Sequence, residues 1–99
     1  MITRIVKMTF KPEGVDRFKE IFYTSQKLIG AFEGCNRVDL MNDINNECIF
    51  FTLSYWNTEE DLNAYRQSYL FRNTWSKVKP LFSEKAEAWS LIPGQNQIL

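Results

Sequence analysis

The first ten residues alternate between apolar and polar side chains. The apolar residues that share one parity are Ile2, Val6, Met8 and Phe10. A period of two places such residues on one face of a β-strand. The pattern therefore predicts a strand over residues 2–10, which ends at the turn sequence 11–14.

The spacing of apolar residues then changes from two to three and four. The positions on this stripe are Val15, Phe18, Ile21, Phe22, Ser25, Leu28 and Ile29. This spacing is typical of an amphipathic helix. We expect a helix over residues 15–29, with Gly30 as its C-terminal stop.

Two further strands are predicted in the middle of the chain, over residues 35–41 and 47–56. The turn-forming residues 42–46 separate them. The second of these strands is apolar on both faces. One face carries Ile49, Phe51, Leu53 and Tyr55, and the other carries Cys48, Phe50, Thr52, Ser54 and Trp56. Both faces are therefore expected to be covered.

Two helices and a final strand account for the rest of the chain. Asn57 or Thr58 is expected to cap a helix over residues 59–67, whose acidic first turn suits the helix dipole. A second helix begins near Ser68 and ends at Pro80. A last strand is predicted over residues 85–92, with small side chains on one face. We expect one domain over residues 1–94 and a C-terminal tail over residues 95–99.

The predicted order β-α-β-β-α-α-β indicates an α+β fold. Connection rules arrange these elements as a ferredoxin-like, four-stranded antiparallel sheet with the helices on one face. The other face would still carry Phe51, Leu53, Trp89 and Leu91. Apolar side chains on an open sheet face favour packing against a second sheet. We therefore expect a homodimer in which two sheets form a dimeric α+β barrel.

Composition excludes several classes of function. The 99 residues include 12 basic and 12 acidic side chains and no histidine. No Lys/Arg block favours nucleic acid as a partner, and no apolar run is long enough for a membrane. The absence of histidine removes the commonest metal ligand, so no metal site is expected. These observations predict a cytoplasmic protein. Cys35 and Cys48 are expected to be unpaired thiols, because the predicted hairpin holds them far apart.

Several short segments together resemble the antibiotic-biosynthesis monooxygenase (ABM) family. They are Met8-Thr9-Phe10, Gly34-Cys35, Tyr55-Trp56 before the acidic helix start, and Tyr69-Leu70-Phe71. The resemblance extends over about residues 2–92 and implies a dimeric α+β barrel. In some members it implies cofactor-independent oxidation of aromatic compounds, and in others it implies haem cleavage. The haem-cleaving members need an Asn, an aromatic residue and a His where this chain has Val6, Tyr65 and Trp75, so haem degradation is disfavoured.

The resemblance to the oxygenase members implies a dry pocket between the sheet and the helices. There a phenolic substrate loses a proton, and the resulting anion passes an electron to O₂. The pocket candidates are Thr52, Ser54, Trp56, Tyr65, Tyr69 and Trp75. The candidates for stabilising the anion are Arg37, Arg66 and Arg72. No general base is identified, because the burial of Asp39 is unknown from sequence, and proton loss could depend on substrate acidity alone.

Structural roles are an alternative for most of these residues. Trp75 has the spacing of a core residue, Tyr65 and Tyr69 could pack on each other, and Arg66 and Arg72 could be surface charges. The leading hypothesis is a cofactor-independent monooxygenase acting on a small aromatic or easily deprotonated substrate. The alternative is a non-catalytic small-molecule-binding or stress-related dimer of the same fold.

Overall fold

The computed structural model describes residues 1–94 and has the element order predicted from sequence. The predicted tail, residues 95–99, lies outside the described residues. The elements are β1 (Ile2–Thr9), α1 (Val15–Gly30), β2 (Cys35–Asn42), β3 (Ile49–Trp56), α2 (Glu59–Arg66), α3 (Tyr69–Val78) and β4 (Glu87–Leu91). Short 3₁₀ turns, Pro12–Gly14 and Lys79–Leu81, precede α1 and follow α3.

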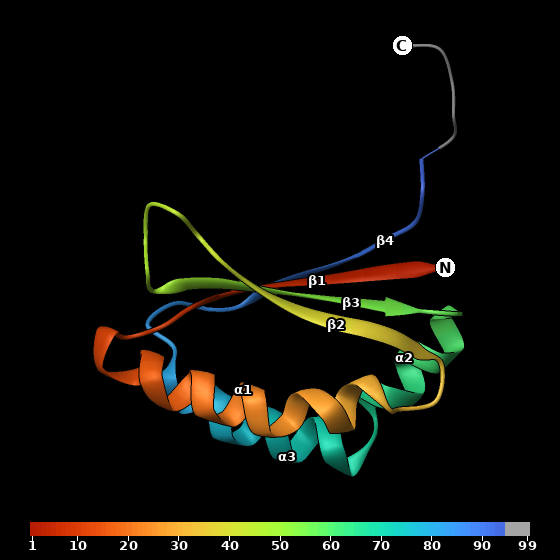
Figure 1. Ribbon diagram of the computed structural model, residues 1–99, viewed down its shortest axis with the longest axis horizontal. Coiled ribbons are helices and arrows are strands. Elements are labelled where there is room, and N and C mark those ends of the chain that lie inside the picture. The colour runs from red at the N-terminus through yellow and green to blue at the C-terminus, as the bar shows by residue number, and fades with distance from the viewer. Residues whose placement is uncertain (95–99) are drawn as a thin grey trace.

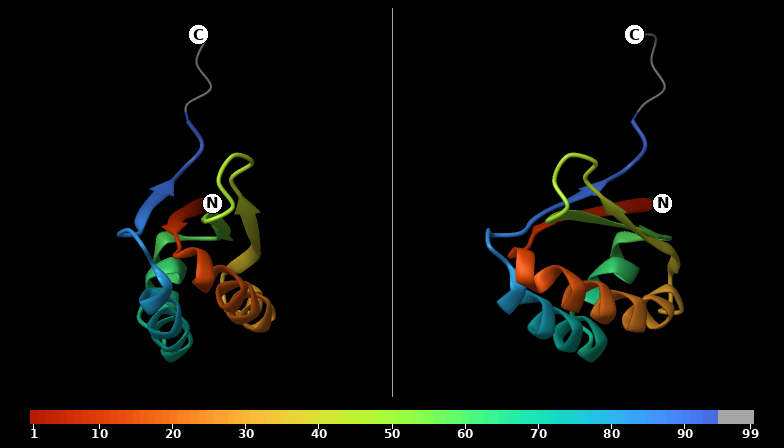
Figure 2. Two further views of the ribbon diagram at one scale, coloured as in Figure 1. Left: turned by 90° about the vertical axis from the view of Figure 1, so that its left-hand side faces the viewer. Right: turned by 60° about the vertical axis from the view of Figure 1, so that its left-hand side comes forward.

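The strands form one four-stranded sheet in the order β2-β3-β1-β4, and each neighbouring pair is antiparallel. The helices lie on one side of this sheet, with α1 and α3 side by side beneath it (Figures 1 and 2). The predicted ferredoxin-like α+β fold is confirmed. Among residues 1–94, no helix combines the length and apolar character needed to cross a bilayer.

Strand register decides which side chains face the helices. On β1 the even-numbered residues point to the helix side, where Met8 and Phe10 are buried. Met8 pairs with Phe50, Val6 with Thr52, and Arg4 with Ser54 across the β1–β3 ladder. Because side chains alternate along a strand, the odd-numbered residues of β1 face the side without helices.

Aromatic rings fill the core at one end of the sheet. Phe10 stacks on Phe18 of α1 with ring centroids 4.2 Å apart, and Phe18 lies 5.2 Å from Phe50. Phe10 and Phe50 are each 1% exposed. Most of the apolar stripe predicted for α1 is confirmed, since Phe18, Ile21, Phe22, Ser25 and Ile29 are its buried residues. The placement of Leu28 on this stripe is wrong, because Leu28 is 58% exposed.

Helix ends follow the predicted capping chemistry with one correction. The hydroxyl of Thr58 accepts a hydrogen bond from the Asp61 N–H at 3.1 Å, so Thr58 rather than Asn57 is the cap of α2. Ser68 caps α3 in the same way. α1 ends at Gly30 as expected, but Gly30 is helical, and the left-handed residue is Gly34, with φ 85°.

Three strands are shorter than predicted, and neighbouring turns bind some of the backbone N–H groups at their ends. β1 ends at Thr9, and Phe10 forms an isolated bridge to Phe82. β3 starts at Ile49 because the side chain of Asn46 accepts the Cys48 N–H at 2.9 Å. β4 covers Glu87–Leu91 rather than residues 85–92. Cys35 and Cys48 are both free thiols, as predicted.

Candidate functional site

A cavity of about 390 Å³ lies between the sheet and the helices. Its volume is near the low end of the range for small-molecule pockets, about 300–1,000 Å³. The sheet contributes Arg4, Val6, Met8, Val38, Thr52, Ser54 and Ala88, and Ala86 lines the cavity just before β4. The helices contribute Phe18, Ile21, Phe22, Ser25, Ile29, Leu62, Tyr65, Arg66, Phe71, Thr74, Trp75 and Val78. Most of the wall is therefore apolar, with a few polar groups.

Two rows of paired residues form the sheet side of the cavity. One row places Ser54, Arg4 and Ser90 next to each other on β3, β1 and β4. The neighbouring row places Thr52 beside Val6 and Ala88. The small side chains predicted for one face of the last strand leave space here. Their size and position explain why the cavity forms beneath β1 and β4 rather than filling with core side chains.

A run of aromatic rings forms the opposite wall. Tyr65 of α2 stacks on Trp56 with ring centroids 5.0 Å apart and meets Phe71 of α3 edge-on at 5.3 Å. Phe71 in turn stacks on Trp75 at 5.9 Å. Tyr65 therefore packs on Trp56 rather than on Tyr69. Trp75 is half-buried and has both roles considered from sequence, since it packs against the core and lines the cavity.

Trp56 supports the cavity from behind. It is fully buried, and its indole N–H donates a hydrogen bond to the Ser54 hydroxyl at 2.9 Å. A buried N–H without a partner would be costly, so this bond fixes the orientations of both side chains. Ser54 lines the cavity, whereas Trp56 does not. Trp56 instead holds Ser54 by its hydrogen bond and Tyr65 by stacking.

Two arginines supply the positive charge at the cavity. The Arg4 guanidinium donates a hydrogen bond from Nη1 to the Ser90 hydroxyl at 2.9 Å. Burial, and secondly the nearby charge of Arg66, lower the pKa of Arg4. Arg66, at the end of α2, is exposed at the rim of the cavity. Within residues 1–94 the ion pairs are Arg17–Glu20 and Arg37–Asp39, so in that part of the chain neither cavity arginine has a carboxylate partner.

Sequence interpretation missed Arg4, although the chain carries a signal for it. Arg4 has the parity of Val6 and Met8, so it shares with them the helix-covered face of the strand. A cation on such a face either needs a buried partner or lines a cavity. That rule, applied to the alternation of residues 2–10, is sufficient to make Arg4 a candidate.

Tyr65 is the remaining titratable group of the cavity wall. Burial, and secondly the neighbouring Cys35, raise the pKa of the Tyr65 phenol well above its ordinary value. A phenol in this state keeps its proton near neutral pH. Tyr65 is therefore a protonated phenol in the cavity wall and cannot serve as a base there.

Besides Trp56, which lies behind the wall, three candidates from the sequence lie outside the cavity. Tyr69 begins α3 and is 73% exposed. Arg72 is exposed on the same helix and does not line the cavity. Arg37 lies on the side of β2 opposite to buried Val38, where its Nε donates to Asp39 at 2.9 Å. The structure thus brings together Thr52, Ser54, Tyr65, Arg66 and Trp75, with Trp56 behind them.

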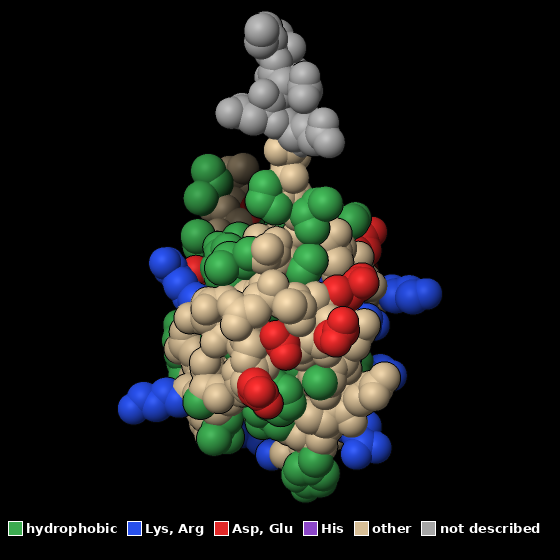
Figure 3. Space-filling model, turned by 90° about the vertical axis from the view of Figure 1, so that its right-hand side faces the viewer, with side chains coloured by type: hydrophobic (Ala, Val, Ile, Leu, Met, Phe, Trp, Pro, Cys, Tyr) green, Lys and Arg blue, Asp and Glu red, His purple; other side chains and the backbone are tan. Residues whose placement is uncertain are grey.

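No carboxylate lines the cavity in the part of the chain that the structure describes. Asp39 belongs to the outer face of the sheet with Arg37. A group of acidic side chains lies instead on the surface at the end of the molecule that carries α2 (Figure 3), whose first turn contains Glu59, Glu60 and Asp61. Among residues 1–94, no three His, Cys, Asp or Glu side chains are grouped so as to hold a metal ion.

Comparison with known proteins agrees with this fold. The family model described as antibiotic biosynthesis monooxygenase matches residues 1–76. No curated protein sequence matches the chain. Among solved structures, one described as an antibiotic biosynthesis monooxygenase superposes with a TM-score of 0.89 at 15% identity, covering 95% of this chain and 99% of the other.

Two further structures have the same fold. A conserved protein from Methanosarcina mazei Go1 has a TM-score of 0.86 and 22% identity, covering 92% of this chain and 91% of its own. A mutant of SnoaB, a cofactor-independent oxygenase from Streptomyces nogalater, has a TM-score of 0.83 and 13% identity, covering 99% and 95%. At sequence identities this low, the structural likeness shows a shared fold and nothing about activity.

Proposed function

Because the chain belongs to the antibiotic biosynthesis monooxygenase family, we propose that it is a cofactor-independent monooxygenase acting on a small aromatic compound that ionises easily. The observation that carries the proposal is the cavity itself. Aromatic side chains wall it on the helix side, Thr52, Ser54 and Arg4 lie on its sheet side, and Arg66 lines it from the end of α2. Such a site can hold an aromatic ring away from water and stabilise negative charge on its oxygen.

The reaction would need no external electron donor. A hydroxylated aromatic substrate with an activated CH₂ group loses a proton, and the carbanion form of the anion passes one electron to O₂. The substrate radical and superoxide then combine to form a C–O bond, giving a peroxide. Loss of water leaves a carbonyl group, so that CH₂ and O₂ become C=O and H₂O. One oxygen atom enters the product, the other enters water, and the substrate supplies all the electrons.

The cavity residues would act on the acidity and position of the substrate. Arg4 and Arg66 would lower the pKa of the substrate hydroxyl, because a nearby positive charge favours its ionised form. Thr52 and Tyr65 would donate hydrogen bonds to the anion. Trp75 and Phe71 would hold the ring and exclude water. With no carboxylate lining the cavity among residues 1–94, the proton would leave through water, driven by the acidity of the bound substrate.

Oxygen consumption tests this function. With 1,8-dihydroxyanthrone as substrate, the parent protein should accelerate O₂ uptake above the uncatalysed rate and form one quinone per O₂. Tyr65→Phe and Thr52→Val should each lower the rate at least about tenfold, since removing one donor to a developing anion costs about 10²–10³ in favourable cases. Tyr69→Phe, which removes the same hydroxyl from an exposed ring, should leave the rate unchanged. Equal rates in the parent and both cavity variants would contradict an active site here.

The binding-only role remains the second candidate, and two observations favour it. No carboxylate lines the cavity among residues 1–94, and the raised pKa of Tyr65 leaves that phenol unable to take a proton. A protein that only binds would show saturable uptake of the aromatic ligand with no oxygen consumed. The same oxygen measurement, made beside a binding titration, separates the two functions.

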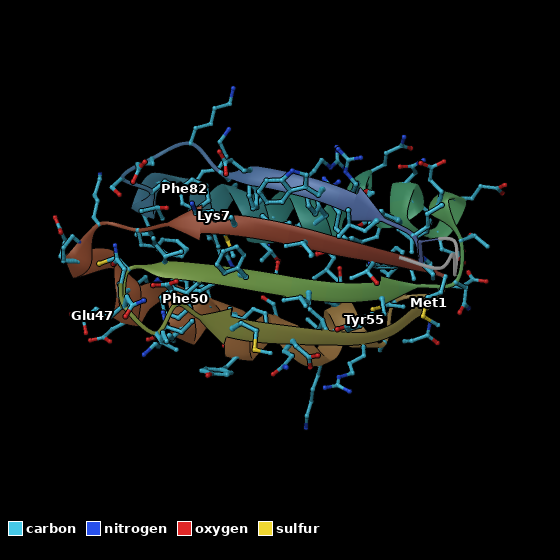
Figure 4. The ribbon with its side chains drawn as sticks, turned by 90° about the horizontal axis from the view of Figure 1, so that it is seen from above. Met1, Lys7, Glu47, Phe50, Tyr55 and Phe82 are labelled. Carbon is cyan, nitrogen blue, oxygen red and sulfur yellow. The ribbon has the colours of Figure 1, made fainter. Side chains whose placement is uncertain are left out.

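The proposal includes a homodimer formed through the sheet face without helices. The register places Ile5 beside Leu53 and Trp89 on that face, and Trp89 is 44% exposed. Figure 4 looks down on this face, with the helices behind the strands. Met41 and Leu91, 55% and 44% exposed, extend the apolar surface. An exposed apolar sheet face of this kind is typical of a subunit interface.

Sedimentation measures the subunit assembly directly. The parent protein should sediment at twice the 11.7 kDa of one chain. Trp89→Glu should shift it towards the single-chain mass, because a charge would be buried without a partner. Tyr23→Glu changes an exposed aromatic residue on α1 and should leave the dimer intact. A parent protein that sediments as one chain at micromolar concentration would overturn the dimer.

A further inference from the structure

The charged side chains that line the cavity within residues 1–94 are all positive. Arg4 and Arg66 both line it, and no Asp or Glu among residues 1–94 does so. The two side chains line the same cavity, and the charge of Arg66 contributes to lowering the pKa of Arg4. Two like charges in a partly desolvated site repel each other, so the cavity favours a ligand that arrives with a negative charge.

The hydrogen-bond geometry leaves room for such a ligand. Arg4 uses Nη1 to bond the Ser90 hydroxyl at 2.9 Å, and this neutral acceptor does not offset its charge. A guanidinium carries five N–H donors in a planar fork, so most of those on Arg4 are still available. Arg66, exposed at the rim, can approach the same ligand from the helix side. A carboxylate is the planar anion that fits guanidinium forks with paired hydrogen bonds.

We propose that Arg4 and Arg66 form a carboxylate-binding site, and that the ligand of this cavity is an aromatic carboxylic acid. The aromatic body lies against Tyr65, Phe71 and Trp75, and the carboxylate lies between the two arginines. This assignment rests on the proposed function insofar as both use the same cavity. It goes beyond that function because it specifies a permanent charged group that a simple phenol lacks.

Calorimetric titration with two matched probes tests the assignment without any turnover. The probes are 1-hydroxy-2-naphthoate and 1-naphthol, which share the ring system and the hydroxyl and differ by the carboxylate. The parent protein should bind the naphthoate at least about tenfold more tightly, as expected for charge-assisted hydrogen bonds. Raising the salt concentration should weaken binding of the naphthoate far more than binding of the naphthol.

Three variants locate the preference. Arg66→Gln removes the charge from an exposed side chain, and Arg4→Gln keeps a donor that can bond Ser90. Each should weaken binding of the naphthoate severalfold more than binding of the naphthol, so that the preference for the naphthoate falls. Arg72→Gln removes the same charge from an exposed site on α3 outside the cavity and should keep the full preference. Thermal unfolding of each variant identifies any loss of folding, and Arg66→Gln alone suffices if Arg4→Gln is unstable.

Any of four results would overturn the carboxylate site. They are equal affinity of the parent for both probes, no binding of either probe, a preference that survives in Arg66→Gln, or an equal loss of preference in Arg72→Gln. The proposed function fails separately. If the naphthoate preference is present and no substrate consumes oxygen, the carboxylate site stands and the oxygenase does not. If oxygen is consumed but the naphthoate preference is absent, the oxygenase function stands and the carboxylate site does not.

Discussion

Gly34 offers a strong test of how the loop before β2 holds α2 in place. Gly34 has φ 85°, a left-handed conformation that L-residues rarely adopt. A Cβ atom at this position would overlap the side chain of Asp61 on α2. The Gly34 carbonyl also accepts the Asn57 N–H at 2.8 Å. We predict that Gly34→Ala destabilises the protein by forcing α2 away from this loop.

The expected magnitude combines two costs. A left-handed backbone costs a residue with a Cβ about 1–2 kcal/mol. Inserting a methyl group where there is no space costs typically about 1–3 kcal/mol. Together these give a loss of about 2–5 kcal/mol in the free energy of unfolding. For a domain of about 100 residues, each kcal/mol shifts Tm by about 4–8 °C, so Tm should fall by about 10 °C or more.

Thermal and urea unfolding, followed by circular dichroism, measure this loss. Gly30→Ala is the matched control, because Gly30 is helical and a Cβ there meets no atom within 4 Å. It should stabilise the protein by about 0.5–1 kcal/mol. A double-mutant cycle with Asp61→Ala separates the two costs, since truncating Asp61 relieves part of the overlap and none of the backbone strain.

Two results would refute this reasoning. A stability of Gly34→Ala within about 0.5 kcal/mol of the parent, the usual range for surface substitutions, would mean that neither cost exists. A cost in Gly34→Ala that Asp61→Ala leaves unchanged would mean that the contact with α2 contributes nothing. Because Leu62, Tyr65 and Arg66 on α2 line the cavity, Gly34→Ala should also weaken ligand binding.

Of three further predictions, two concern single hydrogen bonds and one concerns the titration of Tyr65. Ser54→Ala should cost about 1–3 kcal/mol in chemical denaturation, because it leaves the buried Trp56 N–H without its acceptor; an unchanged midpoint would refute the role of this bond. Ser68→Ala should cost about 1 kcal/mol by removing the cap of α3, and Ser68→Asp should restore most of it. Above about pH 10 the unfolded state releases the Tyr65 proton more readily than the folded state, whose pKa is raised, so stability should fall as pH rises. Tyr65→Phe should reduce this alkaline loss and Tyr69→Phe should not, as measured by urea unfolding from pH 8 to 11.

Local pattern alone determined most of the fold. The alternation of the first strand and the three-to-four spacing of α1 depend on neighbours in sequence, and the structure has both elements where the pattern predicts them. The caps at Thr58 and Ser68 are also local, since a side chain bonds a backbone N–H three residues away. The left-handed conformation of Gly34 could not be predicted from local sequence, because it depends on how the loop packs against Asp61 of α2.

The candidate site shows the same division. Thr52, Ser54 and Trp56 could be found from sequence because hydroxyls and an indole on an apolar strand need partners. Arg37, Arg66 and Arg72 could not be ranked in the same way, since each is a cation in an amphipathic segment. Their positions depend on strand register and helix packing, which place Arg66 at the cavity, Arg37 on the outer face and Arg72 in solvent.

The sequence by itself determined the elements, their order and the two-sided apolar character of β3, because these follow from short-range periodicity. Tertiary structure alone decided that Arg4, on β1, and Arg66, on α2, meet at one cavity, although about sixty residues separate them. Their meeting depends on the pairing of β1 with β3 and β4 and on the position of α2, which no local pattern specifies. The proposed binding of an anion requires both positive charges at one cavity. It therefore depends on long-range packing.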